Sequence, residues 1–148
     1  MESPIKIYVE LLDEGTETWR KAQAVALPNG LFKLLEPENY DPEDEQWPFL
    51  PGSEVRLVEA KHHMGAVGLV AKHPNPEAVE ILVDSAEKFA PPSRETYALP
   101  LGDGLYEVLA TPHYTPEQLW EFPPGSTVRL QPVKTSFPGW NPVKAIAP

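Results

Sequence analysis

The second half of this chain repeats the first. Residues 30–57 align with residues 104–130 when Gln46 is treated as a one-residue insertion, and 14 of the 27 aligned pairs are identical. The longest shared stretch is Pro-Gly-Ser-x-Val-Arg-Leu, at 51–57 and at 124–130. The apolar alternation at residues 5–9 returns at residues 79–83, so the repeat begins at the first expected strand. A repeat has to be identified before any fold is assigned. It predicts two copies of one small unit, residues 1–74 and 75–148.

Proline content indicates the kind of unit. The chain has 19 Pro in 148 residues, a density that interrupts helices and favours short strands joined by rigid turns. Each unit contains about five apolar or alternating segments of strand length. Between the third and fourth segments, Asp41-Pro42-Glu43 and Thr115-Pro116-Glu117 place a capping residue, a proline and an acid in the order typical of a helix start. The sequence therefore predicts a mostly β protein: two tandem small SH3-like or partly open β-barrel units, each with one short helical turn.

The charge balance limits the class of partner. The formal net charge is −10, from 22 acidic and 12 basic residues. The acidity is shared: residues 1–74 hold 13 acids and 7 bases, and residues 75–148 hold 9 acids and 5 bases. Binding to nucleic acid or to an anionic membrane requires a basic face, so both are disfavoured. The charge either attracts a basic protein partner or serves solubility alone.

Several kinds of chemistry lack support in the sequence. There is no Cys, and the chain has neither a stretch long enough to cross a membrane nor a start typical of a signal peptide, so we expect a cytoplasmic location. No nucleophile elbow, phosphate-binding loop or dinucleotide fingerprint is present, so we expect no cofactor and no enzymatic activity. His62 and His63 are adjacent and would point to opposite faces of a strand, so we expect no metal site.

Aromatic residues recur at matched positions, as Tyr40/Tyr114, Trp47/Trp120 and Phe49/Phe122. One interpretation is that they form the core, because Trp and Phe two residues apart on an extended segment face the same side. The other is that they bind a cation or a proline-rich peptide. We favour the core for the Trp and Phe residues and leave both interpretations open for the two tyrosines.

The two copies also differ, and we expect function to lie where they do. The acidic cluster Asp41, Glu43, Asp44 and Glu45 of the first unit becomes Thr115, Glu117, Gln118 and Leu119 in the second. It is interpreted as a helix start or, alternatively, as an acidic docking patch. The segment from Asp13 to Lys21 and the hairpin loops at 62–65 and 136–140 have no matching counterparts either.

One set of known proteins shares several of these motifs. Asp-Glu-Gly-Thr at 13–16, Trp19-Arg20, and Trp-x-Phe-x-Pro-Gly-Ser-x-Val-Arg at 47–56 resemble a set of small uncharacterised bacterial β-proteins. The resemblance covers nearly all of the first unit and the centre of the second, which lacks the Asp-Glu-Gly-Thr loop and the Trp-Arg pair. It implies a bacterial cytoplasmic module and no particular activity.

The leading functional hypothesis is a non-enzymatic, acidic protein-interaction module that binds a basic protein partner. Neutralisation of a toxin by an immunity-type protein is one concrete form. The expected partner contacts are Trp19, Tyr40, Glu43, Asp44 and Glu45. The alternative is a small-molecule or peptide-binding module that uses an aromatic cleft within or between the units. A third class, an enzyme with paired carboxylates, would require two facing acids, one of them with a raised pKa.

Overall fold

The computed structural model describes residues 3–12, 18–62, 65–86, 93–134 and 142–148. The chain divides into two compact units, Met1–Pro76 and Glu77–Pro148. This division lies two residues beyond the one expected from the repeat.

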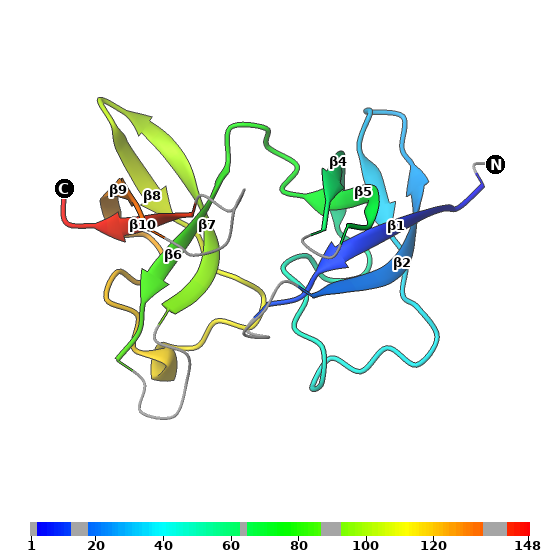
Figure 1. Ribbon diagram of the computed structural model, residues 1–148, viewed down its shortest axis with the longest axis horizontal. Helices are drawn as coiled ribbons and strands as arrows, with labels where there is room; N and C mark the ends of the chain where they lie inside the picture. Colours follow the sequence, from blue (N-terminus) through cyan, green and yellow to red (C-terminus); the bar gives the residue numbers. More distant parts are fainter. Residues whose placement is uncertain (1–2, 13–17, 63–64, 87–92, 135–141) are drawn as a thin grey trace. The chain divides into compact units, whose positions relative to one another are not determined.

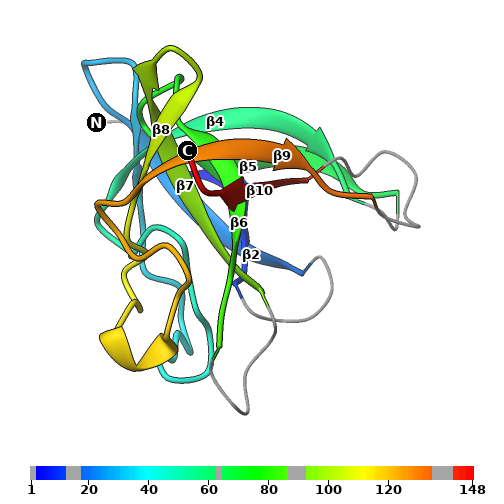
Figure 2. The same ribbon diagram turned by 90° about the vertical axis from the view of Figure 1, so that its left-hand side faces the viewer.

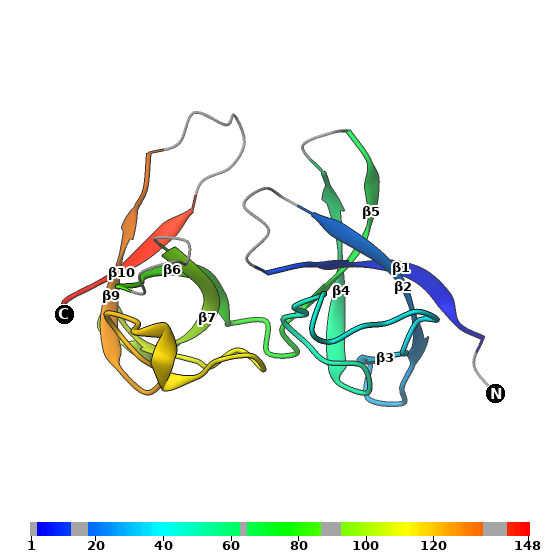
Figure 3. The ribbon, with the colours of Figure 1, turned by 90° about the horizontal axis from the view of Figure 1, so that it is seen from below.

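The first unit is a five-stranded antiparallel meander that closes on itself (Figure 1). Its strands follow one another around the barrel in chain order: β1 (Ile5–Glu10), β2 (Trp19–Ala26), β3 (Phe32–Leu34), β4 (Glu54–Lys61) and β5 (Val67–Lys72). The long connection between β3 and β4 is best seen in Figure 3.

The second unit repeats this arrangement strand for strand. Its strands are β6 (Val79–Asp84), β7 (Ser93–Gly102), β8 (Leu105–Val108), β9 (Thr127–Pro132) and β10 (Val143–Ile146), again in a closed barrel. The first strand pair has the same register in both units, since Ile5 faces Ala24 and Val79 faces Ala98. The prediction of two tandem, mostly β barrel units is confirmed.

The odd number of strands fixes the direction of the closing strand pair. Neighbouring strands of a meander alternate in direction, so the first and fifth run the same way and can pair only in parallel. The structure has one such pairing in each unit, Tyr8 with Val70 and Leu82 with Lys144. An ion pair spans each closure: Lys72 contacts Glu10 at 2.6 Å, and Lys144 contacts Asp84 at 3.0 Å.

The two cores are built from matched residues. The buried cluster of the second unit consists of Ile81, Val83, Ala98, Val108, Trp120, Val128 and Ala145. Each has a buried counterpart in the first unit: Ile7, Val9, Ala24, Leu34, Trp47, Val55 and Ala71. The repeat therefore preserves the inward-facing positions of the strands together with one tryptophan that is supplied by a loop.

The expected helical turn takes a different form in each unit. In the second it is a 3-10 helix, η1 (Pro116–Gln118), visible in Figure 2. In the first, residues 42–44 form a turn in which the amides of Asp44 and Glu45 donate to the Asp41 carbonyl at 3.0 and 2.9 Å. Asp41 caps this turn through its side chain, which accepts from the Glu43 amide at 3.0 Å. Thr115, expected to cap in the same way, makes no capping hydrogen bond through its side chain.

One close approach distinguishes the first barrel. The ring of Tyr8, on β1, lies over Gly68, on β5, so that a Cβ added at Gly68 would stand 2.4 Å from a ring carbon. The Gly68 φ angle is outside the left-handed region. The need for glycine here is therefore steric, and it comes from the one aromatic ring.

This contact predicts that the effect of Gly68→Ala on the stability of the first unit changes sign when the Tyr8 ring is removed. Gly68→Ala should destabilise the first unit by about 1–3 kcal/mol, because the new methyl group displaces the ring. In a Tyr8→Ala background the same substitution should stabilise it by about 0.4–1 kcal/mol, because alanine restricts the unfolded chain. Urea unfolding of the full chain, followed through amide signals of the first unit, measures both values. A Gly68→Ala cost that persists without the ring would contradict the steric explanation.

Candidate functional site

The candidate site is the connection between β3 and β4, residues 35–53, which we call the acidic loop. It contains no Lys or Arg and six acids: Glu36, Glu38, Asp41, Glu43, Asp44 and Glu45. The corresponding connection in the second unit, residues 109–126, contains only Glu117 and Glu121. Because both loops join equivalent strands, the fold does not require the extra charge.

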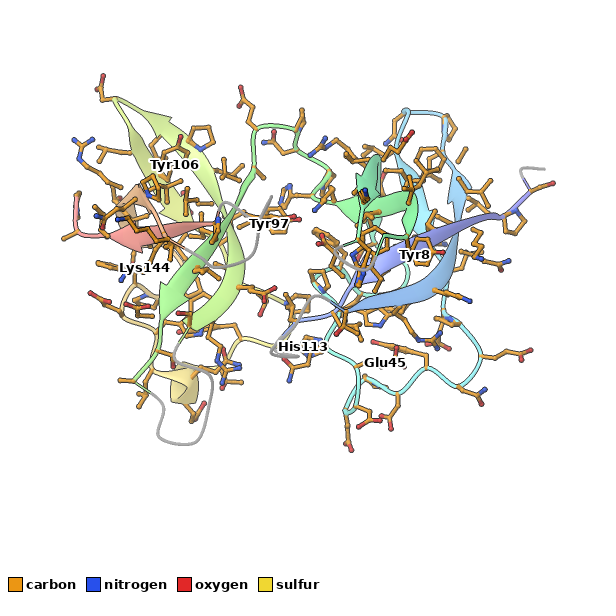
Figure 4. All side chains as sticks on the ribbon, in the orientation of Figure 1. Tyr8, Glu45, Tyr97, Tyr106, His113 and Lys144 are labelled. Carbon is orange, nitrogen blue, oxygen red and sulfur yellow. The ribbon has the colours of Figure 1, made fainter. Side chains whose placement is uncertain are left out.

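Glu45 ties the acidic loop to the barrel. One carboxylate oxygen accepts from Arg20 Nε, on β2, at 2.7 Å and from Trp47 Nε1 at 3.2 Å. The other oxygen accepts from the Asp41 amide at 3.3 Å. The Glu45 side chain is 14% exposed, and Figure 4 shows it within the loop. Glu45, which we expected to contact a partner, is thus engaged by contacts inside its own unit.

These contacts determine the acidity of Glu45. Burial by itself would raise the pKa of the carboxyl. The hydrogen bonds from Arg20, Trp47 and the Asp41 amide, together with the charge of Arg20, outweigh burial and lower the pKa below its usual value. A lowered pKa is the opposite of what a general acid requires, so Glu45 does not provide the raised acid of the paired-carboxylate hypothesis.

We call the hydrogen bond from the buried tryptophan to the side chain two positions before it the tryptophan anchor. In the second unit a neutral residue accepts this hydrogen bond. Trp120 Nε1 donates to Gln118 Oε1 at 2.8 Å, again to the side chain two positions before the tryptophan. The Leu12 amide donates to the Gln46 carbonyl, and the Ala86 amide donates to that of Leu119. Glu45 therefore corresponds to Gln118, and the inserted residue is Asp44 rather than Gln46. The number of identical pairs is the same whether the insertion is placed at Gln46 or at Asp44, so the sequence alone could not identify the inserted residue.

A tyrosine packs against each of these tryptophans. Tyr40 meets Trp47 edge-on with ring centroids 5.2 Å apart, and Tyr114 meets Trp120 at 4.8 Å. Burial is the largest cause of a raised pKa at Tyr40, followed by the negative charges of Glu45, Glu36 and Asp41. Tyr40 therefore lies in the negative field of the acidic loop, although one side of its ring is occupied by Trp47.

Glu43 and Asp44 are exposed at the turn of the acidic loop. Trp19, also an expected contact, belongs to a different cluster: its ring centroid lies 5.1 Å from that of Tyr8 and 5.0 Å from that of His62. The structure thus groups Tyr40, Glu43, Asp44 and Glu45 on one loop and places Trp19 on the strand face near Tyr8.

The recurring Trp and Phe residues are mainly core. Trp47, Phe49 and Trp120 are buried, and Phe122 is half-buried against the second core. Tyr40 and Tyr114 are half-buried. A binding cleft within either unit would have to expose these rings, and the three buried ones are unavailable for it.

Some predicted features lie outside the described residues: the Asp13–Thr16 loop, His63 and Met64, and the loop containing Phe137 and Trp140. Within the described ranges, no group of three or more His, Cys, Asp and Glu side chains is arranged to hold a metal ion. No helix in those ranges is long and apolar enough to cross a membrane.

Comparison of the chain with protein-family models, with curated proteins and with solved structures finds no match.

The tryptophan anchor predicts a pH-dependent difference between Glu45 and glutamine. Glu45→Gln keeps an acceptor for Trp47, as Gln118 does for Trp120, but loses the charge facing Arg20. Above the usual pKa of 4.5, the variant should be less stable by roughly 1 kcal/mol. Because the folded pKa is lowered, the stabilisation by wild-type Glu45 is lost as the pH falls through that lowered value.

The difference between wild type and variant should therefore shrink as the pH falls below 4.5. Urea titrations of the first unit across this range measure it. Glu43→Gln, at an exposed position two residues away, is the matched control and should show no such convergence. A pH-independent cost for Glu45→Gln would refute the charged anchor.

Proposed function

We propose that the protein is a non-enzymatic interaction module whose acidic loop binds a basic protein partner. The observation that carries this proposal is the difference in charge between equivalent loops: six acids in residues 35–53 against two in residues 109–126, with no Lys or Arg in either. Matched loops in one chain share the same fold and the same solvent. The additional acids of the first unit therefore reflect something specific to that loop.

The anchoring of the loop supports this role. Glu45 holds the loop to β2 and to Trp47, so the exposed acids project from a fixed base. A charged surface held in place loses little conformational entropy on binding. It also accelerates encounter with a partner of opposite charge, an effect that salt weakens. Neutralisation of a toxin with a basic active site is one form that this binding would take.

Among the five expected contacts, Glu43 and Asp44 have the most direct role in this proposal because both are exposed. Tyr40 is half-buried on the same loop and packs against Trp47. Glu45 acts as the anchor, and Trp19 would contact a partner only if that partner also covered the β1–β2 face. A cytoplasmic location remains part of the proposal.

A capture experiment with charge variants tests this function. The full chain is immobilised and exposed to lysate of the source organism at low and at high salt. A basic protein should be retained at low salt and released at high salt. Glu43→Lys with Asp44→Lys should reduce its retention at least tenfold, because this double reversal changes the local charge by four units.

The second unit provides the control. Glu117→Lys with Glu121→Lys makes the same change in net charge at exposed positions of the equivalent loop and should leave retention within a factor of two. Equal loss with both pairs would indicate a response to net charge alone. Retention that is indifferent to salt and to the first pair would refute the proposed function.

A further inference from the structure

A groove runs along the edge of β2 in the first unit. Strand β3 pairs with β2 only over Ala24–Ala26, whereas β1 pairs with β2 from Trp19 to Ala24. The first part of β2 therefore has β1 on one side and an open cavity of about 370 Å³ on the other. This β2 groove is lined by Lys6, Arg20, Lys21, Ala22, Gln23, Leu35, Glu36, Pro37 and Glu38.

The two walls of the β2 groove have opposite charge. Lys6 and Lys21 are exposed on the strand side, and Glu36 and Glu38 are exposed on the side of the acidic loop. Arg20 spans the groove, because its Nη1 donates to the Lys21 carbonyl at 3.1 Å and its Nη2 approaches the Glu38 carbonyl at 3.5 Å. Ala22, Leu35 and Pro37 add apolar surface between the charges.

The backbone of β2 faces this groove. Peptide groups along a strand alternate between its two edges. The Gln23 carbonyl accepts from the Leu35 amide at 3.0 Å, so the peptide groups of Gln23 and, two residues earlier, Lys21 point away from β1. The Gln23 carbonyl is already paired with Leu35, so an incoming extended chain would pair with the Lys21 peptide group, where it would replace Arg20 at the carbonyl.

The second unit has different residues at the positions that correspond to the groove lining. The strand-side lysines become Glu80 and Glu95, and the loop-side glutamates become Ala110 and Pro112. Ala22 becomes Thr96, whose hydroxyl donates to the Leu109 carbonyl at 2.5 Å. Tyr97 replaces Gln23 and donates to Glu80 at 3.1 Å. Thr96 thus links β7 to the following loop where the first unit has Ala22, whereas Tyr97 and Glu80 are joined across the β6–β7 pair.

We propose that the β2 groove binds an extended peptide segment of mixed charge, which adds to the edge of β2 as a further strand. An acidic side chain of the segment faces Lys6 and Lys21, and a basic side chain faces Glu36 and Glu38. Phosphate groups are disfavoured by the two glutamates, and a purely basic segment is disfavoured by the two lysines and Arg20. This inference goes beyond the proposed function and does not depend on it, since Glu43 and Asp44 do not line the groove.

A peptide titration of the full chain tests the proposal. The probe is a capped eight-residue peptide in which valine alternates with charged residues, glutamate and lysine in turn. Two further peptides of the same length carry only glutamate or only lysine at the charged positions. Amide signals of residues 20–23 and 35–38 should shift saturably with the mixed peptide and at least tenfold more weakly with the others. Hydrogen exchange at the Lys21 amide should slow when the mixed peptide is bound.

Variants taken from the second unit complete the test. Ala22→Thr introduces at position 22 a hydroxyl equivalent to that of Thr96, opposite the Leu35 carbonyl. Lys6→Glu with Lys21→Glu introduces the charges that Glu80 and Glu95 have in the second unit. Each variant should weaken the mixed peptide at least tenfold. Lys33→Glu with Lys61→Glu changes two exposed lysines outside the groove and should leave binding within a factor of two.

If Ala22→Thr perturbs the core, Lys6→Glu with Lys21→Glu still tests the proposal, because Lys6 and Lys21 are exposed. Binding that survives Lys6→Glu with Lys21→Glu would overturn the proposal, as would preference for either single-charge peptide. Glu43→Lys with Asp44→Lys should leave peptide binding unchanged, so failure here and failure of the proposed function are separate results.

Discussion

The buried indole N–H in each unit is the constraint on which the arrangement of both long loops depends. Trp47 and Trp120 fill their barrels from a loop rather than from a strand. A buried N–H without an acceptor would cost about 1–3 kcal/mol, so each loop must bring a polar side chain back to the tryptophan. Glu45 and Gln118 do so from two positions upstream. Because the acceptor is only two residues from the tryptophan, this hydrogen bond fixes where the rest of the loop leaves the barrel surface.

The choice of acceptor separates the two units. A glutamine satisfies the indole and needs no counter-charge, as in the second unit. A carboxylate at 14% exposure needs a cation, and Arg20 supplies it from β2. Arg20 then lies across the end of the β2 groove, where it also reaches backbone carbonyls of both walls. The difference between Glu45 and Gln118 in the tryptophan anchor therefore connects the acidic loop, the charge on β2 and the groove between them.

The fold could be predicted because the repeat compares the sequence with itself. Positions such as Ile7/Ile81 and Val55/Val128 are alike in both copies because both face the core, and matched turns place the strands between them. Closure of the barrels could not be predicted from the repeat. It depends on a single parallel pairing, such as Tyr8 with Val70, between segments far apart in the chain that carry no local signal. The candidate site was anticipated in part: the acidic loop was visible as composition, whereas the anchoring role of Glu45 depends on Arg20, 25 residues away.

The differences between the copies are informative because the shared fold serves as an internal reference. Lys6, Lys21, Glu36 and Glu38 all change charge class in the second unit, and the two barrels nevertheless keep the same register and the same core. Stability therefore does not dictate these four residues. Solubility does not explain their pattern either, since two positive and two negative side chains add nothing to the net charge. What they do add is a groove with walls of opposite sign, which is a property of recognition rather than of folding. The exposed acids Asp41, Glu43 and Asp44 lie outside the residues that line the groove, and their charge acts at longer range. The first unit thus combines a surface suited to attract a partner with a neighbouring groove suited to select one segment, and the second unit retains the fold with different charges at the corresponding positions.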